Sequence, residues 1–514
     1  TGDENTALGI NALTANTTAN KNVGIGYLAL QATTTGGDNV GVGVGALYTN
    51  TTGTQNIAIG KSALQANTTA SANTSVGWES LYANTTGANN VAYGFESLKA
   101  NTTGGNNVAL GVKSLDENTT GTGNVAVGAS ALNKNTTAIN NTGIGYQALA
   151  ANNTGTLNVA AGYLALGLNT TGAYCVGIGG QALYNNTTAH NNAAVGYLSM
   201  RDNTTGASNT AIGNHTLRAN TTASNNTAVG YTALLSNTTG ANNTAVGSGS
   251  LSAHTTGNSN TALGHNAAQD TTTGYNITAI GRESLANNTT GYDNVAVGKG
   301  TLITNTTGTR NTGLGTAALA ANTTASNNVA VGYAALLANT TGAANTGIGG
   351  NALDSNTTGN ENVALGGYAL AANTTATGNV AIGNRSMEAT TTGAGNIAVG
   401  YYSLNVNTTG ADNTAVGYFS SRLTTTGGSN TALGRQSLYA NTTGNENTAI
   451  GKNSLANNTT ASNNTAVGYD ALTANTTGAN NTAVGKSALA ANTTGATNNT
   501  AIGYYALAAN TTGD

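Results

Sequence analysis

The chain has no proline, one cysteine, one tryptophan and only 6% charged residues among its 514 residues. The lone Cys175 excludes an internal disulfide framework. With 15 basic and 18 acidic residues, the chain has no basic stripe, so we expect no nucleic-acid partner. No apolar run reaches the roughly 18 residues of a membrane span. Acidic residues are too sparse for calcium loops, and we expect no metal, no cofactor and no enzymatic activity.

Glycine, in contrast, recurs with a fixed period. Short apolar segments such as NTALG (5–9), NVGIG (22–26) and NIAIG (56–60) end on glycines spaced 17 residues apart. This spacing holds from Gly9 to Gly485, and one extra residue near Asn498 makes the last step, to Gly503, 18 residues. With this anchor glycine as position 0, the consensus is G-x-x-A/S-L-x-x-N-T-T-G/A-x-x-N-T/V-A-V/I. We expect a single continuous repeat array over residues 1–514, cut in the middle of a repeat at both ends.

The repeat predicts an all-β fold, a parallel β-solenoid with 17 residues per coil and about 30 coils. A helical hairpin needs about 34 residues per repeat, so a repeat of 17 residues is too short for one. Every charged residue falls at positions 1, 2, 5, 6, 11 or 12, which marks these positions as solvent-facing. We expect one strand at positions 13–16 and a second at positions 2–5. The leucine of position 4 would meet the aliphatic residue of position 16 in the core. The predicted core residues include Leu13, Leu30, Leu47, Val127, Ile212 and Val246.

Two asparagine columns would stack at the coil spacing of about 4.8 Å, with each side-chain amide bonded to the next. At position 13 this predicts a structural ladder that includes Asn22, Asn39, Asn56, Asn73 and Asn90. At position 7 the asparagine is followed by Thr at position 9, which also matches the N-glycosylation acceptor N-x-T. Glycans on adjacent coils would crowd, so the ladder is favoured and glycosylation stays the alternative. Examples of these acceptors are Asn16, Asn84, Asn101 and Asn322.

Position 15 is almost always Ala or Gly and never carries charge, which favours close packing against another chain. We therefore expect a parallel homotrimer, the alternative being a monomer with a weakly apolar exposed face. The segments NVAVG (124–128), NVAIG (379–383) and NIAIG (56–60), separated by x-x-A/S-L and a glycine turn, resemble the head repeats of trimeric autotransporter adhesins. Similar repeats occur in phage tail fibres and bacterial surface proteins. The resemblance implies a left-handed parallel β-roll of three chains. This repeat is longer than the adhesin unit, and we expect no stalk, neck or anchor segment within these 514 residues.

These features together predict an extracellular structural fibre or stalk of a surface appendage or adhesin that acts as a stiff spacer. The shaft of a receptor-binding phage tail fibre is the alternative, and adjacent threonines at positions 8 and 9 leave an ice-binding solenoid as a further one. The expected partners are other copies of the chain, as a homotrimer or an end-to-end filament. Tyrosines at position 1 add a carbohydrate or cell-surface receptor as a further candidate partner. The expected location is extracellular, on a cell surface or a virion.

Overall fold

The computed structural model describes residues 2–511, which belong to two compact units, Thr1–Asn258 and Ser259–Asp514. Each unit contains fifteen strands of three residues, and its described residues contain no helix. The strands of unit 1 are β1 (Thr6–Leu8), β2 (Val23–Ile25), β3 (Val40–Val42), β4 (Ile57–Ile59), β5 (Thr74–Val76), β6 (Val91–Tyr93), β7 (Val108–Leu110), β8 (Val125–Val127), β9 (Thr142–Ile144), β10 (Val159–Ala161), β11 (Val176–Ile178), β12 (Ala193–Val195), β13 (Thr210–Ile212), β14 (Thr227–Val229) and β15 (Thr244–Val246). The strands of unit 2 are β16 (Thr261–Leu263), β17 (Thr278–Ile280), β18 (Val295–Val297), β19 (Thr312–Leu314), β20 (Val329–Val331), β21 (Thr346–Ile348), β22 (Val363–Leu365), β23 (Val380–Ile382), β24 (Ile397–Val399), β25 (Thr414–Val416), β26 (Thr431–Leu433), β27 (Thr448–Ile450), β28 (Thr465–Val467), β29 (Thr482–Val484) and β30 (Thr500–Ile502).

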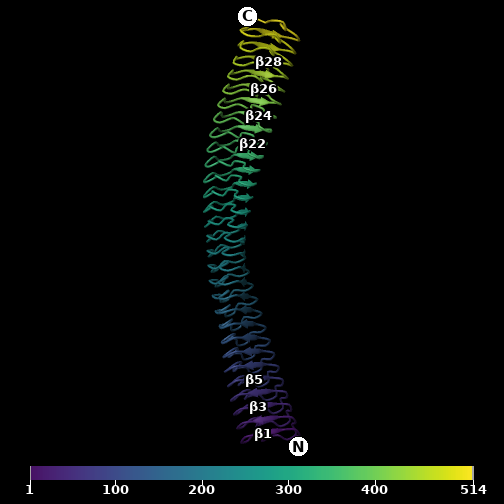
Figure 1. The fold of residues 1–514 in the computed structure, drawn as a ribbon, viewed down its shortest axis with the longest axis vertical. Coiled ribbons are helices and arrows are strands. Elements are labelled where there is room, and N and C mark those ends of the chain that lie inside the picture. Colours follow the sequence, from purple (N-terminus) through teal and green to yellow (C-terminus); the bar gives the residue numbers. More distant parts are fainter. Residues whose placement is uncertain (1, 512–514) are drawn as a thin grey trace. The chain divides into compact units, whose positions relative to one another are not determined.

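Within each unit, every strand pairs in parallel with the next strand along the chain. Val23 pairs with Val40 and Val40 with Ile57, so equivalent positions of successive coils lie side by side. Near the end of unit 2, Thr482 pairs with Thr500, and the extra residue of that coil is taken up without loss of register. Figure 1 shows the strands of neighbouring coils stacked one above another. The prediction of an all-β parallel solenoid with 17 residues per coil is therefore confirmed.

Each coil contains one strand instead of the two expected. Positions 2 and 4 adopt the left-handed backbone region, as at Ser62 (φ 55°) and Leu64 (φ 51°). A strand requires φ near −120°, so the predicted second strand at positions 2–5 is wrong and this segment is a turn. A left-handed leucine costs about 1–2 kcal/mol, whereas burying its side chain contributes about 1.5–3 kcal/mol. Packing therefore outweighs the backbone cost.

The core of each coil is formed by the leucine of position 4 and the small residue of position 15. Leu13, Leu30 and Leu47 are at most 8% exposed, and Ala58 of β4 is completely buried. A Cβ atom added to Gly41 of β3 would lie 3.1 Å from Cγ of Leu30. Because the leucine fills the interior, the strand residue that faces it has to be alanine or glycine, with few exceptions.

This arrangement reverses the expected orientation of the strand. Positions 14 and 16 do share a face, but that face points outward. Ile212 is 44% exposed, while Val127 and Val246 are half-buried on the same outer side. The prediction that these three residues belong to the core is wrong, because an interior one leucine thick has no room for a second branched side chain.

The anchor glycine closes the strand with a backbone conformation that other residues rarely adopt. Gly43 has φ of 134°, and a Cβ atom there would lie 2.5 Å from the carbonyl oxygen of Gly60 in the next coil. The close approach of successive coils at this corner excludes a side chain. This requirement accounts for a glycine at the anchor position of every coil.

The asparagines of position 13 form a buried ladder. Oδ1 of Asn22 accepts the backbone N–H of Asn39 at 2.9 Å, and Oδ1 of Asn39 accepts the N–H of Asn56 at 2.9 Å. The same bond links Asn56 to Asn73 and Asn73 to Asn90. Nδ2 of most of these residues donates to a backbone carbonyl oxygen of the following coil, as from Asn39 to Gly53 at 2.9 Å. The column therefore ties side chain to backbone, and at several steps the side-chain amides are also bonded to each other as expected, as from Nδ2 of Asn56 to Oδ1 of Asn39 at 3.1 Å.

Candidate functional site

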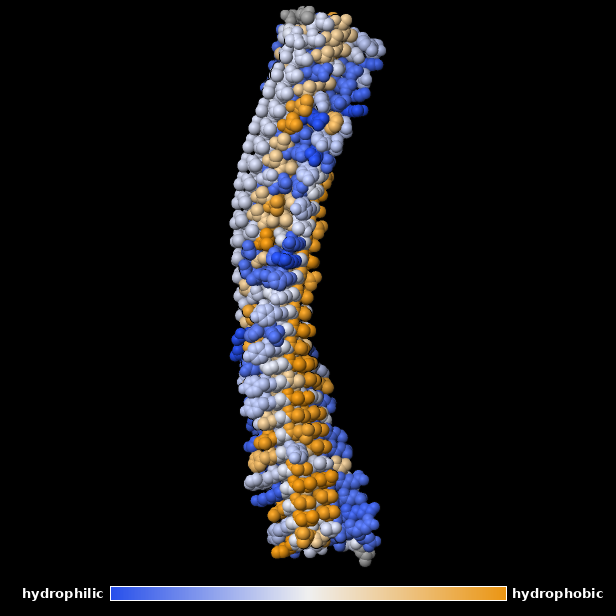
Figure 2. Space-filling model, viewed as in Figure 1, coloured by the Kyte–Doolittle hydropathy of each residue, from blue (hydrophilic) through white to orange (hydrophobic). Residues whose placement is uncertain are grey.

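The first and third residues of every strand face outward, and together they form a surface that we call the sheet face. The third residue is Val, Ile or Leu in 28 of the 30 strands, and the first is Thr in 16 of them. Ile144 and Ile178 are 45% and 41% exposed. No charged residue lies in any described strand. Figure 2 shows these residues as an apolar stripe that runs along the coils of unit 1.

The asparagines of position 7 form a second buried column, which includes most of the candidate glycosylation sites. Asn84, Asn101 and Asn322 are completely buried. Nδ2 of Asn101 donates to Oδ1 of Asn84 at 2.8 Å and to the carbonyl oxygen of Gly104 at 2.9 Å. Asn16, in the first coil, is partly exposed and donates to Ala19 at 3.2 Å. The buried amide nitrogens cannot carry glycans in the folded coils, so the ladder interpretation of this column is the one the geometry supports.

The two threonine columns differ in their surroundings. At position 8 the hydroxyl donates to the backbone of the next coil, as from Thr34 Oγ1 to the carbonyl oxygen of Thr51 at 3.2 Å. At position 9 the side chains, such as Thr35 and Thr52, are exposed. The two neighbouring columns therefore do not form one flat array of threonines.

The residues with the most reactive side chains lie inside the coil or apart from each other. Cys175 takes the place of a ladder asparagine and is buried, with Sγ 3.4 Å from the carbonyl oxygen of Ala189. Burial raises the pKa of its thiol. His254 occupies position 7, where Nε2 lies 2.7 Å from the carbonyl oxygen of Gly257. Among residues 2–511, no three or more His, Cys, Asp or Glu side chains come together in a way that could hold a metal ion.

Charged side chains of unit 1 form ion pairs between neighbouring coils. Nζ of Lys99 lies 2.7 Å from carboxylate oxygens of both Glu79 and Glu96, and Lys113 lies 3.3 Å from Glu96. The hydrogen bond from Lys99 lowers the pKa of Glu96, and partial burial raises the pKa of Asp116. This patch stabilises the turns, and its cations are already paired with acids.

Aromatic side chains at position 1 stack along the coils. Tyr146 and Tyr163 lie parallel with ring centroids 5.8 Å apart, and Tyr401 and Tyr418 do the same at 5.6 Å. The sequence singled out this column, but it did not reveal the neighbours supplied by positions 2 and 5. Those neighbours include Arg422, whose guanidinium lies 4.6 Å from the ring centroid of Phe419.

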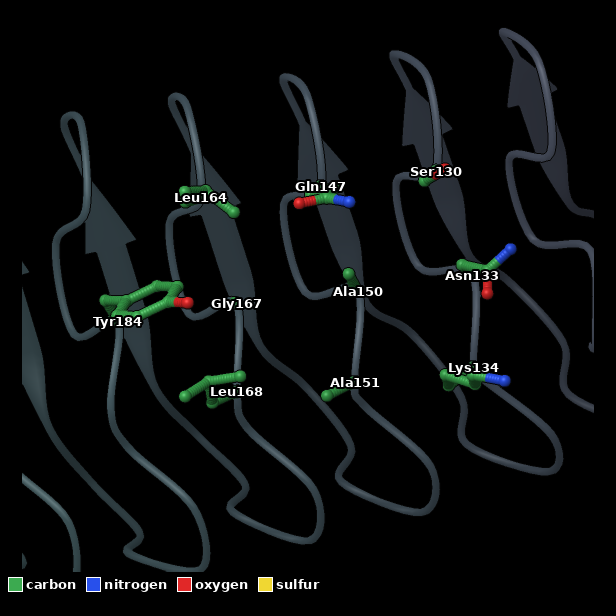
Figure 3. Close-up of a pocket in the computed structure, with 10 residues that line it drawn as sticks. All are labelled: Ser130, Asn133, Lys134, Gln147, Ala150, Ala151, Leu164, Gly167, Leu168 and Tyr184. Carbon is green, nitrogen blue, oxygen red and sulfur yellow. The ribbon is translucent and has the colours of Figure 1, made fainter.

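Open hollows lie over the turn positions 2, 5 and 6, where small residues leave space between larger ones. One of about 330 Å³ crosses four coils of unit 1 and has Ala150, Ala151 and Gly167 at its floor, between Lys134 and Tyr184. Figure 3 shows these side chains in successive coils. The lining offers hydrogen-bonding and apolar groups to a ligand.

The described part of the chain contains no helix of the length and apolarity needed to cross a bilayer. The chain matches no family model and no curated protein.

Proposed function

We propose that the chain forms the shaft of an extracellular fibre in which copies associate through the sheet face, most simply as a parallel trimer. The observation that carries this proposal is that no described strand carries a charge and that its third, outward residue is Val, Ile or Leu in 28 of the 30 strands. A strand about 10 Å wide, stacked over fifteen coils about 4.8 Å apart, presents roughly 700 Å² in each unit. A stable interface buries about 800 Å² per partner, so the sheet faces of the two units offer enough area to hold copies together.

Identical repeats also match each other in shape. A second copy presents the same ridge of side chains at the same coil spacing, so parallel copies can align coil by coil. Because charge is confined to other positions, association buries no carboxylate or ammonium group and avoids its desolvation cost. The expected product is a fibre whose role is mechanical, as the spacer of an adhesin or another surface appendage. The shaft of a phage tail fibre would use the same association.

The experiment compares the mass of the native particle with that of two triple variants. Ile144→Lys, Ile178→Lys and Ile212→Lys place three charges on the sheet face, at side chains that are 41–45% exposed. The matched control places lysines on the exposed tyrosines Tyr146, Tyr163 and Tyr197 of the same or adjacent coils. We expect the parent and the control to be trimers and the sheet-face variant to dissociate. A monomeric parent, or a sheet-face variant that stays trimeric, would overturn the proposal.

Ice binding is a second candidate function, favoured by the regular parallel sheet and its outward threonines at the first strand position. In that case the sheet face would stay open to water, and the chain would be a monomer with measurable thermal hysteresis. Lysines at Ile144, Ile178 and Ile212 would then abolish the hysteresis without changing the particle mass. The two functions are thus separated by one set of variants.

A further inference from the structure

An edge of unit 2 carries cations that form no ion pair with any acid among the described residues. The side chains at position 1 of six successive coils are Tyr401, Tyr418, Arg435, Lys452, Tyr469 and Lys486, and all six are exposed. Among the described residues, the three cations Arg435, Lys452 and Lys486 form no ion pair with a carboxylate. The ion-paired patch of unit 1 has no counterpart here. We call these six residues the cation–aromatic edge.

The charges of this part of unit 2 are segregated between the two ends of the strands. All four cations between residues 401 and 486 follow the strands, at positions 1 or 5. Asp412 and Glu446 precede the strands, at position 12, and only Asp470 lies on the same side as the cations. A field of one sign along an exposed edge attracts a ligand of the opposite sign.

The aromatic rings of the edge are covered on their faces by neighbours in adjacent coils. Nζ of Lys452 lies 5.3 Å and Nζ of Lys486 5.8 Å from the ring centroid of Tyr469. The ring of Tyr418 stacks on that of Tyr401 and also has Arg435 at 5.7 Å. Single-stranded nucleic acids bind by stacking their bases on open ring faces. Because these faces are already occupied, the edge favours a ligand that is recognised through its anionic groups.

A fourth cation beside the edge has unused hydrogen-bonding capacity. The guanidinium of Arg422 lies 4.6 Å from the ring centroid of Phe419 and 5.2 Å from that of Tyr402. Nη1 donates to the hydroxyl of Tyr439 at 3.3 Å, and the buried Nε has no protein acceptor. Held in this position by rings, the planar guanidinium is suited to a carboxylate or sulfate oxygen.

Next to the edge lies an open hollow of about 530 Å³ with hydroxyl and amide groups in its lining. Asn453, Asp470, Thr473 and Ser487 contribute to it, together with alanines and Tyr505. Nδ2 of Asn453 donates to Oδ1 of Asp470 at 2.9 Å, and the second carboxylate oxygen has no protein donor among the described residues. A carboxylate with a free oxygen accepts hydrogen bonds from hydroxyl groups. The edge thus joins sites for anions to sites for hydroxyls.

We propose that the cation–aromatic edge and the adjoining hollow bind an acidic polysaccharide, a polymer whose sugars carry both carboxylates and hydroxyls. The cations of alternate coils, such as Lys452 and Lys486, lie about 10 Å apart along the stack, since coils are spaced by about 4.8 Å. An extended polymer can place its carboxylates against several of them at once, so that many weak contacts add to a useful affinity. The site lies outside the sheet face and does not depend on the number of copies in the fibre.

The test measures binding of the full chain to alginate, a polymer of uronic acids, with neutral dextran for comparison. The edge variant combines Arg435→Gln, Lys452→Gln and Lys486→Gln. Its matched control, Lys61→Gln, Arg282→Gln and Lys299→Gln, removes three cations from position 1 of other coils. We expect alginate to bind the parent and the control equally, the edge variant to bind at least about tenfold more weakly, and dextran not to bind. Equal binding by the edge variant and the control would overturn the proposal.

A further variant separates sugar recognition from general attraction to polyanions. Asp470→Asn makes the edge more positive but removes the free carboxylate oxygen that accepts sugar hydroxyls. We expect it to weaken alginate binding about threefold or more, in the range of one lost hydrogen bond. Tighter binding of alginate by Asp470→Asn would show that charge alone acts and would overturn the assignment. Binding of a single-stranded oligothymidylate or of anionic phospholipid vesicles as tight as that of alginate would overturn it as well.

Discussion

The buried amide column of position 7 makes a sharp prediction at Asn322. Its Nδ2 donates to Oδ1 of Asn305 at 2.8 Å and to the carbonyl oxygen of Ala325 at 3.1 Å, while its Oδ1 accepts from Asn339 at 3.0 Å. The substitution Asn322→Asp replaces the donor by an acceptor that faces two other acceptors. Each buried group left without a partner costs about 1–3 kcal/mol. We therefore expect a local loss of roughly 3 kcal/mol or more.

The loss should stay local, because each coil contacts only its neighbours. Amide hydrogen exchange read by mass spectrometry is therefore the suitable assay. The N–H of Thr323, which donates to Thr340 at 3.1 Å, should exchange roughly a hundredfold faster, since about 1.4 kcal/mol corresponds to a factor of ten. Burial raises the pKa of the new carboxyl group, so the folded form binds the extra proton and the defect should shrink as the pH falls.

The matched control is Asn322→Thr, which repeats a replacement that the chain already contains. At Thr271 the hydroxyl oxygen accepts from Nδ2 of Asn288 at 3.3 Å, so the acceptor function of the column survives. We expect this variant to cost about 1–2 kcal/mol, less than aspartate, because Oδ1 of Asn305 loses its donor, as Oδ1 of Asn373 beside Thr390 already lacks one, but no acceptor is forced against another. If aspartate and threonine changed exchange at Thr323 to the same extent, the hydrogen-bonded column would not be the source of stability and the reasoning would fail.

Three further predictions concern single positions. Gly43→Ala should destabilise its coils by at least about 2 kcal/mol, as measured by hydrogen exchange, because φ at Gly43 is 134° and the new Cβ atom would lie 2.5 Å from the carbonyl oxygen of Gly60. The control Gly350→Ala should be neutral, because a Cβ atom there meets open space. Cys175 should resist iodoacetamide in the native chain, because it is buried and the pKa of its thiol is raised. The substitution Cys175→Asn should restore the ladder bond to the N–H of Asn192 and stabilise these coils by about 1 kcal/mol. Fast labelling of the native chain, or a destabilised Asn variant, would contradict the structure. Asp116 has a raised pKa, so acidification should stabilise its coil as this carboxyl takes up its proton, whereas Glu96 has a lowered pKa, so protonation of Glu96 should weaken its coil by less than about 1 kcal/mol as the bond to Lys99 is lost. Exchange measured against pH should lose the weakening around Glu96 in Lys99→Met, and an unchanged weakening would argue against this pair.

The period and the edges of the coil could be predicted from the sequence, whereas the orientation of the strand could not. Alternation along a strand assigns residues to two faces but does not say which face is inside. The deciding factor is volume, since Leu47 of position 4 already fills the coil and only a small residue such as Ala58 fits against it. The larger residues Ile57 and Ile59 are therefore turned outward and are 39% and 42% exposed.

The missed second strand and the missed cation–aromatic edge have a common cause. Leucine disfavours the left-handed region, so nothing in the residue types of position 4 predicts that Leu64 has φ of 51°. Without this turn, the places of positions 2 and 5 around the coil could not be derived. The proximity of Arg422 to Phe419 and Tyr402 follows from the turn geometry, although the clustering of Arg and Tyr in residues 401–439 is a signal that the sequence does contain.

The amide column of position 7 also has a direction. In both units the Nδ2 of the later coil donates to the Oδ1 of the earlier coil, as from Asn67 to Asn50 and from Asn356 to Asn339. The amide dipoles of a column therefore add, as peptide dipoles do in a helix, with the negative end toward the later coils. A second coil stack that continues the column beyond its last coil has to present Nδ2 donors to the Oδ1 atoms exposed there. Growth by end-to-end addition is thus restricted to head-to-tail contacts, and a filament built from this repeat would be polar along its whole length.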